Sequence, residues 1–258
     1  PNSGSQFDWL GAVLSAGTLI VLLLAMTNGH KFGWSSPLIL LANLGFVALL
    51  CAFIWWELRA SNPMLNLRFF ARRTFSFGVT AEFLSFLGTS ATFILTPFYL
   101  QGVLGYSAAA SGFILVSSAI SLTLGGLFSG VLSDRYGWRP FTVGGLAVCA
   151  TGIFMFSRMT DQSSLVLVIV ALFLTNIGSG TFYAPNASSV LGSVGPASYG
   201  IVSGLLNLMR NGAGIISLAM ATAIITATMG SLGFEPSLNA IRETAGAGHA
   251  FSVGLRNS

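Results

Sequence analysis

The feature that most constrains this chain is a series of seven apolar runs, each about as long as a membrane span. Their approximate bounds are Asp8–Thr27, Pro37–Trp56, Phe75–Leu100, Ala108–Leu132, Phe141–Ser157, Leu165–Ala187 and Ser198–Thr228. A bilayer requires about 20 apolar residues per helical span. Only 7% of the residues are charged, against about a quarter in a soluble domain. The sequence therefore predicts an all-α integral membrane protein with about seven transmembrane helices. We expect the last thirty residues to form an outer loop and a short tail.

The charged and metal-binding residues exclude several functions. The net charge is +4 and the basic residues are dispersed, so nucleic-acid binding is not indicated. The two cysteines, Cys51 and Cys149, lie inside apolar runs and are predicted to be buried packing residues. Two histidines are too few for a metal cluster, and no cofactor is expected. A membrane-embedded enzyme would need clustered acids or histidines, whereas the seven acids are scattered singly, so we do not expect an enzyme.

The two ends of the chain and its basic residues predict its context and orientation. A polar segment without an initial methionine, residues 1–6, opens the chain, and we expect it to be a linker inside a longer protein. The connectors after the second and fourth runs carry six Lys and Arg residues, against two in those after the first, third and fifth. Basic loops stay in the cytoplasm, so we expect the former connectors there. All five tryptophans fall at predicted span ends, where indoles favour the membrane interface.

The third run carries a polar stripe. Its members recur at steps of three and four residues, which places them on one helical face: Gly78, Glu82, Ser85, Thr89, Thr92 and Thr96. Serine and threonine can also bond back to their own helix. Because five polar residues including a carboxylate share the face, we interpret it as a wall of a cavity.

Two other runs carry polar or small residues. The sixth run has a shorter polar series, Asn176, Ser179, Tyr183 and Asn186, which fits either a cavity or a polar contact in the bundle core. Its residues Gly178, Gly180 and Pro185 are expected to loosen the helix. Small residues follow one side of the fourth run, where they predict close helix packing: Ser111, Ser118, Ser121, Gly125 and Ser129.

Two charges are predicted inside the spans. Glu82 is the only acid placed there, and burial disfavours its charged form, which suits reversible protonation. We therefore expect Glu82 to carry a coupling proton or to recognise a cation. Arg210, with Asn207 before it, lies far from the predicted start of the seventh run and is a functional candidate. Two alternatives stay open: Arg210 reaches to the membrane surface, or it pairs permanently with Glu82, which would make both structural.

The connector between the fourth and fifth runs contains the chain's most specific motif. Gly130, Asp134, Arg135, Gly137 and Arg139 resemble the signature loop of the major facilitator superfamily, although a second basic residue is commoner in the family at Trp138. The alternative is a solvated turn that marks the cytoplasmic face. From the resemblance we expect Asp134 to approach a helix N-terminus or an arginine and to lock one arrangement of two helical bundles.

Further segments resemble the fourteen-span drug:proton antiporter branch of this family: Phe7–Gly11, Asn62–Phe70, Pro97–Ser107 and Ser203–Asn207. The resemblance implies that residues 1–60 are a linker with two extra helices, and that residues 61–258 are an incomplete C-terminal six-helix bundle with about five spans. The third and sixth runs would line the cavity, and the fourth and seventh would meet the absent N-terminal half. Residues 249–255 resemble the start of a last span.

The resemblance also implies a function. The protein would be a multi-pass transporter of the plasma (inner) membrane that exports amphiphilic small molecules in exchange for protons by alternating access. Its partners would be its substrate, protons, the lipid bilayer and the missing N-terminal half of the same transporter. A proton-coupled importer and a non-transporting fragment or accessory subunit remain the alternatives.

Overall fold

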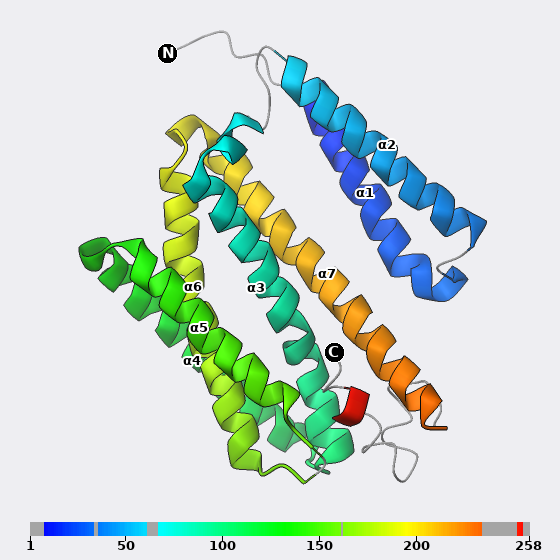
Figure 1. The fold of residues 1–258 in the computed structure, drawn as a ribbon, viewed down its shortest axis with the longest axis vertical. Helices are drawn as coiled ribbons and strands as arrows, with labels where there is room; N and C mark the ends of the chain where they lie inside the picture. The colour runs from blue at the N-terminus through cyan, green and yellow to red at the C-terminus, as the bar shows by residue number, and fades with distance from the viewer. Residues whose placement is uncertain (1–7, 34–35, 61–66, 161, 234–251, 255–258) are drawn as a thin grey trace. The chain divides into compact units, whose positions relative to one another are not determined.

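A computed structural model describes residues 8–33, 36–60, 67–160, 162–233 and 252–254 of the chain (Figure 1). Within these ranges the regular structure is helical and contains no strand, which confirms the predicted all-α class. The long helices are α1 (Trp9–Phe32), α2 (Pro37–Arg59), α3 (Arg73–Phe98), α4 (Ala108–Tyr136), α5 (Trp138–Ser157), α6 (Leu165–Gly192) and α7 (Tyr199–Ser231). The short ones are η1 (Leu67–Ala71), the π-helical turn η2 (Tyr99–Val103) and η3 (Pro196–Ser198).

Six of the described helices, α2 to α7, are long and apolar enough to cross a membrane, and α1 holds a shorter apolar stretch, Trp9–Ala25. The predicted spans agree with the helices to within a few residues. The largest differences are at the ends of α1 and α6, which run on to Phe32 and Gly192, and α4 runs on to Tyr136. Helices α1 and α4 each stop at a glycine with positive φ, Gly33 at 85° and Gly137 at 83°. Glycine adopts this backbone conformation without steric cost and so ends a helix.

The described residues form two units. The first comprises residues 1–76 and 193–204, and in it α1 packs against α2. The Asp8 carboxylate caps α1 by accepting from the Gly11 backbone N–H at 2.8 Å, and it also accepts from the Trp56 indole at 2.9 Å. The start of α1 is thereby fixed to the end of α2. Trp9, Trp55, Trp56 and Trp138 lie within a turn or so of helix ends, as predicted, whereas Trp34 lies outside the described residues.

The second unit comprises residues 77–192 and 205–258, and in it α6 packs against both α4 and α5. The approach is close because glycines face the neighbouring backbone. A Cβ at Gly125 of α4 would lie 2.5 Å from the Ile177 carbonyl oxygen, and one at Gly145 of α5 would lie 2.8 Å from the Gly178 carbonyl oxygen. The small residues of α4 named above are all buried, which confirms the predicted close packing.

Gly178 and Gly180 do not loosen α6, contrary to the prediction. The helix is continuous from Leu165 to Gly192 with Pro185 inside it. A Cβ on either glycine would collide with the backbone of α5 or α4, so both glycines serve the contact with neighbouring helices.

An apolar core closes one end of this unit, contributed by α3, η2, α5, α6 and α7. Tyr99 is fully buried in it, and its hydroxyl donates to the Thr160 carbonyl oxygen at 2.5 Å. A described turn at residues 252–254 reaches the same end, since a Cβ at Gly254 would lie 2.9 Å from the Ile225 Cα. The rest of the predicted outer loop and tail lies outside the described residues.

Candidate functional site

The polar stripe of α3 meets α6 and α7 at a buried carboxylate. Glu82 is 0% exposed, and each of its oxygens accepts a hydrogen bond. Oε1 accepts from the Arg210 Nε of α7 at 2.5 Å, and Oε2 accepts from the Asn186 amide of α6 at 2.7 Å. The same amide donates to the Gly78 carbonyl oxygen at 3.1 Å. Two donors from two helices therefore hold the carboxylate in place.

Arg210 differs from Glu82 in its exposure, since 34% of its side chain is accessible. Its guanidinium carbon lies 5.6 Å and 5.8 Å from the ring centroids of Phe86 and Tyr183. These two rings stack on each other with centroids 4.8 Å apart and planes at 17°. The structure therefore forms the Glu82–Arg210 pair that was the alternative at the sequence level, and it adds an aromatic pair beside the guanidinium.

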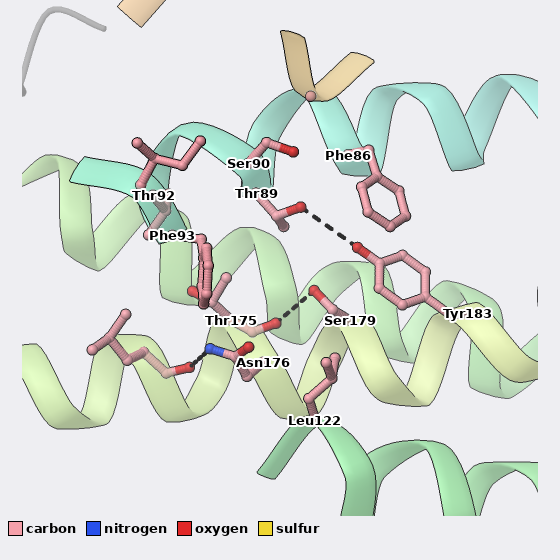
Figure 2. A pocket seen from close by; sticks show the side chains of 13 residues that line it. Phe86, Thr89, Ser90, Thr92, Phe93, Leu122, Thr175, Asn176, Ser179 and Tyr183 are labelled. Carbon is pink, nitrogen blue, oxygen red and sulfur yellow. Dashed lines mark hydrogen bonds between the residues drawn. The ribbon is translucent and has the colours of Figure 1, made fainter. Parts of the chain in front are cut away.

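Phe86 and Tyr183 also line a cavity of about 320 Å³ (Figure 2). Its walls come from α3, α4, α6 and α7: Phe86, Thr89, Ser90, Thr92, Phe93, Ile94, Leu122, Leu172, Thr175, Asn176, Ser179, Tyr183 and Gly214. Glu82 precedes Phe86 by one turn on α3, and Arg210 precedes Gly214 by one turn on α7. The ion pair thus adjoins the aromatic end of the cavity.

The predicted cavity residues divide into two groups. Thr89, Thr92, Asn176, Ser179 and Tyr183 line the cavity. Glu82 and Ser85 do not line it, and the buried Glu82 carboxylate contacts α6 and α7 instead. The stripe on α3 is therefore a helix contact at its Gly78 end and a cavity wall in its middle.

The polar groups in the wall are partly engaged already. Thr89 donates to the Ser85 carbonyl oxygen at 2.9 Å, Ser179 to that of Thr175 at 2.7 Å, and the Asn176 amide to that of Leu172 at 2.8 Å. Figure 2 shows the Tyr183 hydroxyl pointing across to Thr89, at 3.5 Å. The alternative for these residues was a hydrogen bond to a carbonyl oxygen of their own helix. They make such bonds and also line the cavity. Such a wall of rings, hydroxyls and one amide suits an apolar ligand with a few polar groups.

Some residues of the site were missed by the sequence analysis. Ser90, Thr175 and Gly214 line the cavity without belonging to the predicted set. Asn186 was placed in a polar series, but its contact with Glu82 was not predicted. Its spacing could have indicated this contact, because Asn186 follows Tyr183 by three residues and so shares the face of α6 that reaches α3.

The signature-motif residues lie at the junction of α4 and α5. Gly130 lies in α4, and Asp134 and Arg135 are exposed in the last turn of that helix. Gly137 alone links the two helices. In α5, the guanidinium carbon of Arg139 lies 5.4 Å from the centroid of the Trp138 ring. Within the described part of the chain, the Asp134 side chain makes no hydrogen bond or ion pair, so it is bonded there to neither of its predicted neighbours, a helix N-terminus or an arginine.

The remaining candidate residues lie apart from the cavity. Asn207 is exposed, and its side-chain oxygen accepts from the Asn211 amide at 3.1 Å. The described ranges contain no group of three or more metal-ligating side chains. Cys149 is buried, with Sγ 3.3 Å from the Ser179 hydroxyl, but Cys51 is exposed, contrary to prediction. Cys51 lies on α2, which is apolar along its length and mostly exposed, so an apolar position there does not imply burial.

The chain is similar to known transporters. The Major Facilitator Superfamily matches residues 3–218. Lincomycin resistance protein LmrB of Listeria monocytogenes is 27% identical over 97% of this chain and 54% of its own length. Multidrug resistance protein Stp of Mycobacterium tuberculosis is 27% identical over 90% of this chain and 43% of its own length. Cephamycin export protein CmcT of Amycolatopsis lactamdurans is 30% identical over 85% of this chain and 46% of its own length. The chain spans about half the length of these curated relatives.

These matches agree with the motif resemblance, with the predicted location in the plasma membrane and with the assignment to transporters and not to enzymes. The family match covers most of the chain, and the helices described above supply the multi-pass membrane architecture that it requires. This chain belongs to the Major Facilitator Superfamily.

Proposed function

We propose that the full-length protein exports amphiphilic small molecules across the plasma membrane in exchange for protons. The observation that carries the proposal is the position of Glu82. Within the described helices it is the one acid far from a helix end, it is fully buried, and it lies one turn from an aromatic and hydroxyl-lined cavity. The names of the relatives, which include a multidrug resistance protein and a cephamycin export protein, support export of small molecules.

In this proposal Glu82 takes up and releases the coupling proton. Each of its oxygens accepts one hydrogen bond, from Arg210 or from Asn186, and protonation of the carboxylate would weaken both bonds. Protonation removes the negative charge that holds Arg210, and loss of the proton restores the pair. This exchange would connect proton binding to the position of α7 relative to α3, because Glu82 and Arg210 belong to these two helices.

The proposal includes an arrangement in the membrane. Residues 1–60 would be a linker with two additional helices, and residues 61–258 would be part of a bundle that rocks against an N-terminal half of the same transporter. The exposed apolar side chains of α4 would meet that half: Phe113, Ile120, Leu124, Leu127 and Val131. The N-terminal linker, the α2–α3 connector and the α4–α5 link would face the cytoplasm.

The test is Glu82→Gln in the full-length protein, reconstituted in vesicles with an imposed pH gradient. We expect loss of pH-driven substrate movement, since a glutamine cannot exchange the proton, together with normal expression. Glu57→Gln is the matched control, because Glu57 is also a buried acid but lies near the end of α2 in the first unit. Wild-type transport by Glu82→Gln across the physiological pH range contradicts the proposal. The direction of substrate movement relative to the gradient separates export from import.

A further inference from the structure

Arg210 has hydrogen-bond donors that the described part of the chain does not use. A guanidinium carries five N–H donors, and Glu82 accepts only from Nε. Among the residues that the structure describes, the two terminal nitrogens of Arg210 make no hydrogen bond. The side chain as a whole is 34% exposed, although Arg210 lies about 17 Å from the start of α7 at 1.5 Å per residue. An accessible guanidinium at such a depth is a functional candidate.

The surroundings of these nitrogens are those of a ligand site. Arg210 adjoins the stacked rings of Phe86 and Tyr183, which wall the cavity. Gly214, one turn further along α7, also lines the cavity. A molecule could therefore lie along the rings while one of its ends meets the guanidinium.

The same geometry argues against a cationic ligand in this half. No residue that lines the cavity carries a carboxylate. Glu82, the nearest acid in the described chain, has no exposed surface, and both of its oxygens are occupied by Arg210 and Asn186. A cation entering the cavity would therefore find no free counter-charge, whereas an anion would find two parallel donors in the fork that matches a carboxylate.

We propose that the terminal nitrogens of Arg210 bind the carboxylate of an amphiphilic substrate whose apolar or aromatic body lies along Phe86 and Tyr183. This inference rests on the proposed function in assuming that the cavity binds the transported molecule. Glu82 orients the guanidinium through Nε and leaves the fork free, so Glu82 is a positioning residue for substrate binding as well as the proposed proton site.

The experiment measures binding of three probes of equal size to the full-length protein: a fluorescent naphthalene carboxylate, its primary amide and its aminomethyl analogue. The protein is held in nanodiscs of zwitterionic lipid, so that anionic lipid headgroups do not compete for Arg210. Wild type should bind the carboxylate about tenfold more tightly than the amide, because a bidentate charge-assisted pair exceeds a neutral hydrogen bond. The aminomethyl analogue should bind most weakly.

Arg210→Lys keeps the charge beside Glu82 but removes the fork. It should reduce the carboxylate-to-amide ratio to about threefold or less, with amide binding unchanged. The matched control is Arg158→Lys, at the end of α5 over the Phe154 ring, which should leave all three affinities unchanged. If Arg210→Lys does not fold, the probe series on wild type decides alone.

A carboxylate that binds no more tightly than the amide, or does not bind at all, overturns the proposal. So does tightest binding of the aminomethyl analogue. The two proposals fail separately: unchanged pH-driven transport in Glu82→Gln rejects proton coupling, whereas loss of carboxylate preference concerns Arg210 alone.

Discussion

At the scale of single residues, the Glu82–Arg210 pair is asymmetric, because Glu82 is fully buried and Arg210 is one-third exposed. Removing Arg210 leaves a carboxylate without its cation in a buried site, whereas removing Glu82 leaves a guanidinium that water can reach. Loss of one partner of a buried pair costs about 3–5 kcal/mol. We therefore expect Arg210→Gln to lower the free energy of unfolding of the full-length protein by an amount in this range. We expect Glu82→Gln to lower it clearly less. Heating the detergent-solubilised variants and measuring the remaining monodisperse protein checks this order.

The double variant Glu82→Gln/Arg210→Gln is the control for this comparison. It removes both charges, so it should recover most of the stability that Arg210→Gln loses. Equal losses in the two single variants, without recovery in the double variant, would mean that the pair does not determine stability.

At the scale of elements, α6 depends on glycines for its contacts with α4 and α5. Gly144 and Gly145 are neighbours on α5 that differ in this respect: a Cβ at Gly144 meets nothing within 4 Å, whereas one at Gly145 lies 2.8 Å from the Gly178 carbonyl oxygen. Alanine in a helix is favoured over glycine by about 1 kcal/mol. We expect Gly144→Ala to be neutral or stabilising and Gly145→Ala to be destabilising, because the backbone of α6 has to move away. The two melting temperatures check this prediction.

The comparison carries its own control, since both variants make the same chemical change one residue apart in the same helix. If Gly145→Ala were as stable as Gly144→Ala, the close contact between α5 and α6 would be too compliant to require glycine.

At the scale of the whole molecule, the signature motif contains a carboxylate, that of Asp134, for which the described chain supplies no bonding partner. Asp134 is exposed in the last turn of α4 and makes no ion pair within the described ranges. A carboxylate is disfavoured at a helix C-terminus, so its presence calls for a partner elsewhere, for which we propose the N-terminal half. Asp134→Asn in the full-length protein should therefore lower transport turnover several-fold with expression unchanged. Initial transport rates, normalised to the amount of protein in the membrane, measure this.

Asp134→Glu retains the charge and should keep most of the turnover. Wild-type rates in Asp134→Asn would reduce the motif to a cytoplasmic turn without a role in switching.

Much of the architecture could be predicted from local patterns. The apolar runs located all seven long helices of the described chain, and Gly137, which separates α4 from α5, lies in the predicted connector. The small residues of α4 correctly indicated close packing. Errors occurred where a residue's role depends on a neighbour: Gly178 and Gly180 suggested a loosened helix, and Cys51 suggested burial. The sequence alone does not show what faces these residues.

The sequence by itself determined that this chain is a membrane protein, where its helices lie and which faces of α3 and α6 are polar, because hydropathy and helical spacing are properties of contiguous residues. Only the tertiary structure decided how those polar faces are used. Glu82 and Arg210 are 128 positions apart, and Asn186 is 104 positions from Glu82. Their meeting depends on how three helices cross and rotate about their axes. The same crossing removes Glu82 from the cavity wall and leaves the Arg210 guanidinium beside Phe86 and Tyr183.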